Sequence, residues 1–224
     1  MVKYIVDHIP RNTLFNRRPG LAMAPTTITI HNTGNPSSRA RNERAWLTNT
    51  ANNRTASYHI VIDENEAIEC IPLNENAWHA GDGSGPGCGN RTSIGIEICE
   101  SGDYARTLQN AAQLVASMLR EREWGVDRLH RHFDWSGKIC PRLMYDDGKW
   151  TGWAAFKNMV AALIAEKEEE TLELSAYQWQ TLRAGVAALL DKGTITDKTW
   201  LEKIDKKTLT TSELSWLTFV ITTK

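Results

Sequence analysis

Two histidines and one cysteine of this chain have the residue types and the spacing of a zinc site. His31 ends a β-branched, alternating stretch, directly before a loop of Asn, Gly and Pro. His132 and Cys140 lie eight residues apart in a stretch without a regular hydrophobic period. Zinc favours neutral imidazole and thiolate ligands, and three protein ligands leave the fourth position open, which is the catalytic arrangement. The alternative for a histidine at a strand end is an ordinary hydrogen-bonded residue.

Alternating strands and helices over the first ~165 residues would position these side chains. Period-two alternation and β-branched residues predict strands at residues 26–31, 56–63, 67–71, 93–98 and 129–132, the second and third forming a hairpin. Apolar faces with helical spacing predict helices from Ser37 or Ser38 to about residue 50, at 104–123 and at 150–169. This order of elements indicates an α/β fold.

The last ~55 residues form a separate, all-helical segment in this interpretation. The charged run at residues 166–170 is expected to be a hinge. Three short apolar stripes follow, and Ser175 and Thr210 each begin a capping-box spacing. We therefore expect a catalytic domain at residues 1–168 and a small helical module at residues 169–224.

Composition excludes several classes of protein. The 224 residues carry 26 Lys and Arg against 27 Asp and Glu, so the chain lacks the basic excess of a nucleic-acid binder. No apolar run reaches 18 residues, so we expect no membrane insertion. Residues 1–10 do not resemble a secretory signal, so we expect the chain to be made in the cytoplasm. The four cysteines are too few for a disulfide scaffold. Cys99 is expected in the core, whereas Cys70 and Cys88 could pair in an oxidising exterior.

Five ordered motifs make the chain recognisable over roughly residues 20–165. They are ITIHNT at 28–33, ASYHIVID at 56–63, AWHAGD at 77–82, NRTSIGIE at 90–97 and HFDWSGKICP at 132–141. Together they resemble the zinc-dependent N-acetylmuramoyl-L-alanine amidases of the Amidase_2, or peptidoglycan-recognition-protein-like, superfamily, most of all the amidase domains of phage and prophage endolysins. The resemblance implies a mixed central β-sheet flanked by helices. It also implies one Zn²⁺ per chain at the floor of a groove, held by His31, His132 and Cys140.

Zinc hydrolysis also needs a base and a group that stabilises the developing oxyanion. Glu97 is the candidate base, because a carboxylate inside an apolar strand is costly unless it is paired; a structural salt bridge is the alternative. Lys138 resembles the family lysine that faces the zinc, and a plain surface lysine is its alternative. Tyr58 matches a tyrosine to which some relatives assign proton transfer, and we expect it to assist Glu97.

Three further residues resemble positions that line the family's substrate groove. His79 resembles a histidine that contacts substrate, although it could equally be a hydrogen-bonded loop residue. Trp78 and Asn32 are weaker candidates for the same groove.

The expected function is cleavage of the amide between N-acetylmuramic acid and L-alanine in peptidoglycan, by a phage or prophage endolysin that lyses the host cell. Such an enzyme would be made in the host cytoplasm and reach the wall after membrane permeabilisation. One alternative is a noncatalytic peptidoglycan-binding module, although such modules typically lose the cysteine ligand that Cys140 provides here. Another is a cysteine hydrolase with Cys140 as nucleophile and His132 as base.

For the C-terminal module we expect cell-wall targeting, a common endolysin arrangement. Homodimerisation through Trp200, Trp216 and neighbouring apolar residues is the runner-up. A helical cap packed on the catalytic domain is the third alternative.

Overall fold

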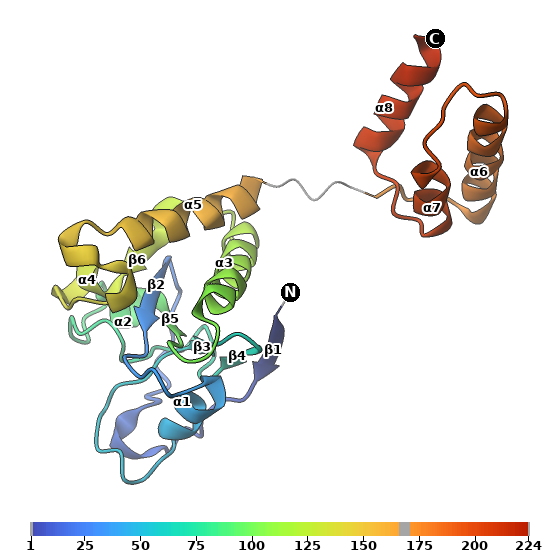
Figure 1. The fold of residues 1–224 in the computed structure, drawn as a ribbon. Coiled ribbons are helices and arrows are strands. Elements are labelled where there is room, and N and C mark those ends of the chain that lie inside the picture. Colours follow the sequence, from blue (N-terminus) through green and yellow to red (C-terminus); the bar gives the residue numbers. More distant parts are fainter. Residues whose placement is uncertain (1, 166–170, 224) are drawn as a thin grey trace. The chain divides into compact units, whose positions relative to one another are not determined.

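The computed structural model describes residues 2–165 and 171–223, and the chain divides into two compact units, Met1–Ala165 and Glu166–Lys224 (Figure 1). The predicted charged hinge at residues 166–170 and the predicted end of the closing helix lie outside the described residues. No helix in the described part of the chain is long and apolar enough to cross a membrane.

The N-terminal unit is built on a mixed sheet, as predicted. Its strand order in the described residues is β1-β4-β3-β5-β2-β6. The strands are β1 (Lys3–Val6), β2 (Thr27–Asn32), β3 (Ile60–Ile62), β4 (Glu66–Glu69), β5 (Ser93–Ile98) and β6 (Leu129–Arg131). The β3–β4 hairpin is antiparallel and the other neighbours pair in parallel. The sequence did not predict β1, an edge strand whose residues are mostly exposed.

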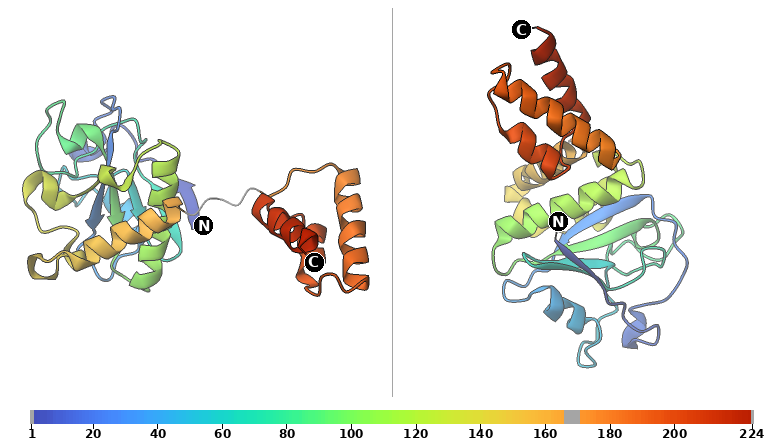
Figure 2. Two further views of the ribbon diagram at one scale, coloured as in Figure 1. Left: turned by 90° about the horizontal axis from the view of Figure 1, so that it is seen from above. Right: turned by 90° about the vertical axis from the view of Figure 1, so that its right-hand side faces the viewer.

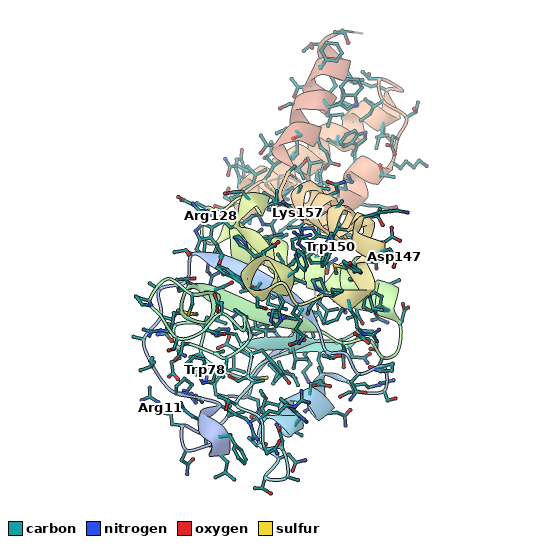
Figure 3. The ribbon with its side chains drawn as sticks, turned by 90° about the vertical axis from the view of Figure 1, so that its left-hand side faces the viewer. Arg11, Trp78, Arg128, Asp147, Trp150 and Lys157 are labelled. Carbon is teal, nitrogen blue, oxygen red and sulfur yellow. The ribbon has the colours of Figure 1, made fainter. Side chains whose placement is uncertain are left out.

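Helices cover both faces of this sheet. Figures 1 and 2 show α3 (Tyr104–Arg120) and α5 (Thr151–Ala165) on one face and α1 (Ala40–Trp46) on the other. In Figure 3, Lys157 marks α5, and Trp150 directly precedes it. The remaining helical segments of this unit are α2 (Gly89–Thr92), α4 (His132–Ser136) and the short 3₁₀ turns η1 (Leu14–Asn16), η2 (Val126–Arg128), η3 (Arg142–Met144) and η4 (Asp146–Gly148).

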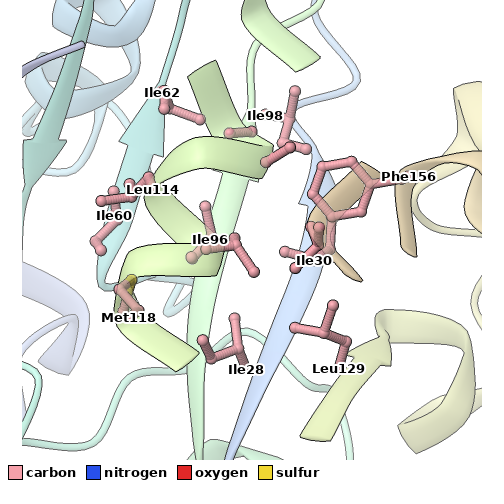
Figure 4. Close-up of a cluster of buried hydrophobic side chains, with 14 of the residues drawn as sticks. Ile28, Ile30, Ile60, Ile62, Ile96, Ile98, Leu114, Met118, Leu129 and Phe156 are labelled. Atoms are coloured by element: carbon pink, nitrogen blue, oxygen red, sulfur yellow. The ribbon is translucent and has the colours of Figure 1, made fainter. Parts of the chain in front are cut away.

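Isoleucines from alternate positions of β2, β3 and β5 form the main core against α3 and α5. Figure 4 shows the strand residues meeting Leu114 and Met118 of α3 and Phe156 of α5; they are Ile28, Ile30, Ile60, Ile62, Ile96 and Ile98. Burying one such side chain contributes roughly 1.5–3 kcal/mol. Because side chains alternate between the faces of a strand, His31 and Glu97 point toward the opposite face, where α1 lies.

A second buried cluster lies on the α1 face. It includes Tyr58, Val61, Cys70 and Cys99, so the expected core position of Cys99 is confirmed. All four cysteines are free in the structure. The pairing considered for Cys70 and Cys88 is therefore absent: Cys70 is in this core, whereas Cys88 is at the N-terminus of α2.

The predicted N-cap of α1, Ser37 or Ser38, is wrong by one or two residues. The helix begins at Ala40 after Arg39, whose backbone N–H donates to Asn42 Oδ1 at 3.2 Å. Ser38 lies one residue before this N-cap, so its side chain does not cap the helix. The predicted strand at 56–63 is shorter than expected, since only Ile60–Ile62 pairs as β3.

The C-terminal unit contains the three predicted helices, α6 (Ala176–Asp191), α7 (Thr199–Asp205) and α8 (Thr211–Thr222). Both predicted capping boxes are present, from Ser175 to Gln178 and from Thr210 to Glu213. The three helices and their loops enclose a small core of their own, made of Trp179, Val186, Ile195, Ile204, Leu209 and Leu217.

Candidate active site

His31, His132 and Cys140 meet as the sequence predicted. Among the described residues, these three form a cluster that could hold a metal ion, because their donor atoms all lie within 4.8 Å of one another. His31 Nδ1 lies 3.0 Å from His132 Nδ1 and 3.7 Å from Cys140 Sγ. All three residues are buried.

Strand pairing explains why residues so far apart in the chain meet. The parallel pairing of β2 with β6 places Ile30 opposite Arg131, so His31 and His132 emerge at the same edge of the sheet. The chain then passes through α4 and returns, and Phe133 N–H donates to the Cys140 carbonyl at 3.1 Å. This return brings the Cys140 thiol beside the two imidazoles.

The protonation states at this cluster fit a cation site. Burial, with a smaller contribution from the nearby Lys138 ammonium, lowers the pKa of His31 well below 6.5 and that of His132 to about 4. Both rings are therefore neutral at pH 7, as metal ligation requires. Burial also raises the pKa of the Cys140 thiol to about 12, so the thiolate forms at neutral pH only if a cation stabilises it.

Glu97 is held beside these donors by the next strand. In the β2–β5 ladder it is the register partner of His31, so both side chains lie on the same face. One carboxylate oxygen, Oε2, is buried and has no hydrogen-bond partner in the structure. Burial raises the pKa of Glu97 to about 8; the Glu43 carboxylate adds to this effect and Lys138 opposes it. This carboxyl group is thus able to exchange a proton near neutral pH.

A groove of about 410 Å³ brings the other predicted residues together. Seven of the nine residues predicted for the site line it: Asn32, Tyr58, Trp78, His79, Glu97, His132 and Lys138. The remaining two lie directly behind this lining: His31 contacts His132, and Cys140 contacts His31. Lys138 is exposed and extends from the loop between His132 and Cys140.

Several of these side chains are already engaged within the protein. The Tyr58 hydroxyl donates to the Glu43 carbonyl at 2.8 Å, and burial raises its pKa well above 10. Asn32 Nδ2 donates to the Tyr104 hydroxyl at 3.1 Å, while its Oδ1 accepts from Leu143 N–H at 3.0 Å. The indole N–H of Trp78, labelled in Figure 3, donates to the Asn16 carbonyl at 2.9 Å.

His79 lines the groove but is almost completely buried. Its Nδ1 lies 3.1 Å from His31 Nε2, and its Nε2 lies 3.0 Å from the Ser93 carbonyl oxygen. Both ring nitrogens therefore have partners inside the protein.

The groove also has walls that sequence reasoning missed. Glu43 and Trp46 of α1 line it, and so does Arg54 from the following loop. The signal for the first two was their i, i+3 spacing, which places both side chains on one face of a helix. No spacing pattern marked Arg54.

A family model described as N-acetylmuramoyl-L-alanine amidase matches residues 21–143, a segment that contains His31, Glu97, His132 and Cys140. The chain belongs to this amidase family.

Named relatives and solved structures agree with the family. The chain is 46% identical over 133 residues to the Bacillus subtilis N-acetylmuramoyl-L-alanine amidase XlyB, covering 58% of this chain and 41% of XlyB. It is 43% identical to XlyA of the same organism, covering 70% of this chain and 50% of XlyA. The chain thus spans half or less of the length of these curated relatives.

The structural likeness covers the N-terminal unit. The catalytic domain of XlyA aligns with a TM-score of 0.64 at 42% identity, covering 71% of this chain and 99% of that domain. PlyL aligns with a TM-score of 0.60 at 35% identity, covering 73% of this chain and 98% of PlyL. The mixed sheet with its flanking helices is therefore the fold of this amidase family.

Proposed function

We propose that this chain is a zinc-dependent hydrolase that cleaves the amide bond between N-acetylmuramic acid and L-alanine in peptidoglycan. The observation that carries the proposal is the buried cluster of His31, His132 and Cys140 beside a groove lined by Glu97 and Lys138. Membership of the amidase family supports the choice of bond.

The donor set fits zinc. With zinc–nitrogen bonds of about 2.05 Å and a zinc–sulfur bond of about 2.3 Å, tetrahedral geometry places two nitrogens about 3.3 Å apart and nitrogen and sulfur about 3.6 Å apart. The corresponding separations are 3.0 Å and 3.7 Å. Two imidazoles and one thiolate also match the ligand types that zinc prefers. Bound zinc would polarise the scissile carbonyl and a water molecule.

The protein side chains supply the proton transfers. Glu97 takes a proton from the attacking water and delivers it to the departing L-alanine nitrogen, a task suited to a carboxyl group whose pKa is about 8. The Lys138 ammonium stabilises the negative charge that develops on the carbonyl oxygen. Tyr58 assists from the groove wall, and Trp78, Asn32 and His79 remain the predicted substrate contacts.

For the biological setting we propose an endolysin. The chain is 41% identical to a mutant endolysin from Bacillus subtilis whose structure is solved, with a TM-score of 0.64. The substrate is then the wall of the host cell, which the enzyme reaches from the cytoplasm after membrane permeabilisation, and the outcome is host-cell lysis.

For residues 169–224 we propose cell-wall targeting through aromatic side chains. Tyr177, Trp216 and Phe219 are exposed, and the Trp216 and Phe219 rings stack at 5.6 Å. A cavity of about 420 Å³ is lined by Trp216 and Trp200 together with polar groups that include Asp197 and Ser212. Flat aromatic faces with polar groups beside them suit sugar rings. Homodimerisation through the same exposed rings is the second candidate.

The test is to digest purified walls and identify the new chain ends. The proposal predicts free L-alanine amines together with muramic acid that keeps its lactyl carboxyl group. New reducing sugar ends without new amines would show a different bond, and binding without release would favour the noncatalytic module. Activity that survives complete removal of metal would favour the cysteine hydrolase.

A further inference from the structure

Both ring nitrogens of His79 have partners inside the protein, and these partners determine which nitrogen carries the proton. The Ser93 carbonyl can only accept a hydrogen bond, so His79 Nε2, 3.0 Å away, must carry a proton. Neither nitrogen of this buried ring pairs with a carboxylate. A buried, neutral imidazole has one N–H, and Nδ1 of His79 is therefore an acceptor.

This assignment fixes the next ring. His31 Nε2 lies 3.1 Å from His79 Nδ1, and because His79 Nδ1 accepts, His31 Nε2 must donate. The lone pair of His31 is then on Nδ1, the nitrogen that faces His132 Nδ1 and Cys140 Sγ.

His132 lies on the other side of this nitrogen. Its Nδ1 faces His31 Nδ1 at 3.0 Å, and its Nε2 lies beside Gly81, where an added Cβ would come within 3.2 Å of it. If both rings bind one metal ion, the single proton of neutral His132 is on Nε2, and Nδ1 of His132 also presents a lone pair. Two lone pairs 3.0 Å apart repel each other unless a cation lies between them. A metal ion between the two Nδ1 atoms would therefore satisfy both rings.

Packing holds the His79 ring in the orientation that these roles require. Its backbone N–H donates to Asn90 Oδ1 at 2.7 Å, which fixes the loop. The ring lies against Gly95, where an added Cβ would come within 2.6 Å of His79 Cγ. The His59 ring packs against its edge, with centroids 5.7 Å apart.

We propose that His79 is a positioning residue that holds His31 as the Nε2–H tautomer, so that Nδ1 of His31 binds the metal. The relay runs from the Ser93 carbonyl through His79 to His31. This inference rests on the metal site of the proposed function. Outer partners of this kind orient a ligating histidine and raise its basicity.

Two matched substitutions separate the two hydrogen bonds of His79. In His79→Asn, an amide oxygen near the position of Nδ1 can still accept from His31, but the bond to Ser93 is lost. In His79→Gln, an amide nitrogen can still reach Ser93, but the acceptor for His31 is lost. We expect His79→Gln to weaken zinc binding by about 10–100-fold and His79→Asn to weaken it much less. Affinity is measured by competition with a chromophoric chelator, after circular dichroism shows that each variant is folded.

Imidazole ¹H–¹⁵N correlation spectra of the zinc-loaded, full-length wild type read the tautomers directly. We expect the protons of both His31 and His79 on Nε2. A proton on Nδ1 of His31, or equal zinc affinities of the two folded variants, would overturn the proposal, and if the variants do not fold the spectra alone decide it. If the wild type does not bind zinc, the proposed function fails, whereas zinc binding and wall cleavage with the opposite tautomer contradict this inference only.

Discussion

At the scale of single residues, Glu97 shows a conflict between stability and chemistry. A carboxyl group with one buried, unpartnered oxygen destabilises a fold, because its charged form loses hydration without gaining a partner. The same burial gives Glu97 a pKa of about 8, which suits proton transfer at neutral pH. A residue kept for stability would be paired, so its surroundings favour a catalytic role.

Replacing Glu97 by Gln is expected to remove most turnover while keeping fold and metal. Loss of a positioned general base typically costs about 10²–10⁴-fold in rate. The variant should bind zinc like the wild type and unfold at a similar temperature, since a carboxyl group with a pKa of about 8 is mostly uncharged at pH 7 and Gln has nearly the same shape. Rates on soluble muramyl-peptides, zinc content and thermal melts measure the three effects.

Tyr58→Phe is the matched control, because its hydroxyl donates to the Glu43 carbonyl. We expect a smaller loss of rate than for Glu97→Gln. The opposite order, with Glu97→Gln near wild-type turnover and Tyr58→Phe inactive, would assign the base to Tyr58.

Residue types were more predictable than residue partners. His31, His132 and Cys140 were predicted from their ligand chemistry and from the motifs around them, because residue types and spacing can be read from the sequence. The contacts of His79 were not, because they depend on which ring nitrogen meets which group from another strand. Arg54 was missed because it joins the groove from a loop without a repeating pattern.

At the scale of elements, Gly95 of β5 makes room for the His79 ring. A Cβ at this position would approach His79 Cγ to 2.6 Å, and the ring is held by hydrogen bonds on both sides. We therefore expect Gly95→Ala to displace His79, lower zinc affinity and destabilise the N-terminal unit by roughly 1–3 kcal/mol.

The comparison is Gly185→Ala in α6, where a Cβ meets nothing within 4 Å. Alanine in a helix interior is favoured over glycine by about 0.5–1 kcal/mol, so this variant should gain stability. Chemical denaturation and zinc competition test both variants. Unchanged zinc affinity in Gly95→Ala would show that the ring adapts.

Ion pairs of one carboxylate, Glu75, connect the N-terminal segment to the loop after β4. Glu75 pairs with Arg18 at 2.8 Å and with Arg11 at 3.0 Å, and mainly its hydrogen bond with Arg18 lowers the pKa of Glu75 to about 2. A lowered folded-state pKa means that the carboxylate stabilises the fold above about pH 4.5 and that this contribution is lost as the pH falls toward 2.

Glu75→Gln is therefore expected to be less stable than the wild type at pH 7, by roughly 1–3 kcal/mol. The difference should shrink between about pH 4.5 and pH 2. Thermal melts of both proteins across this range provide the measurement. A stability difference that stays constant with pH would show that Glu75 acts through packing rather than charge.

The elements that build the site were the most predictable. β2 and β5 are long, alternating and buried, and their predicted bounds differ from the structure by at most one residue. β1 was missed because an exposed edge strand needs no apolar alternation. The start of α1 was misplaced because its N-cap is Arg39, which is not one of the usual capping residues.

At the scale of the whole molecule, each compact unit has a core of its own. We therefore expect a chain that ends at Ala165 to fold alone and to cleave soluble muramyl-peptides at the full-length rate. Lysis of intact cells should fall much more, because wall binding through the C-terminal aromatic residues is lost.

Trp216→Ala in the full-length chain tests one exposed aromatic side chain instead of the whole C-terminal unit. Cell pull-down and mass measurement in solution accompany both assays. Unchanged cell binding with conversion of a dimer into a monomer would assign dimerisation to residues 169–224, and an insoluble truncated chain would show that our boundary is wrong.

The central claim is that cleavage depends on zinc bound by His31, His132 and Cys140. The most direct test removes metal with a chelator, verifies its absence, and titrates zinc back while counting the L-alanine amines released from purified walls. We predict that activity disappears, returns in proportion to zinc and reaches its limit at one zinc per chain, and that Cys140→Ser neither retains zinc nor recovers. Full activity in the verified metal-free protein would contradict the account.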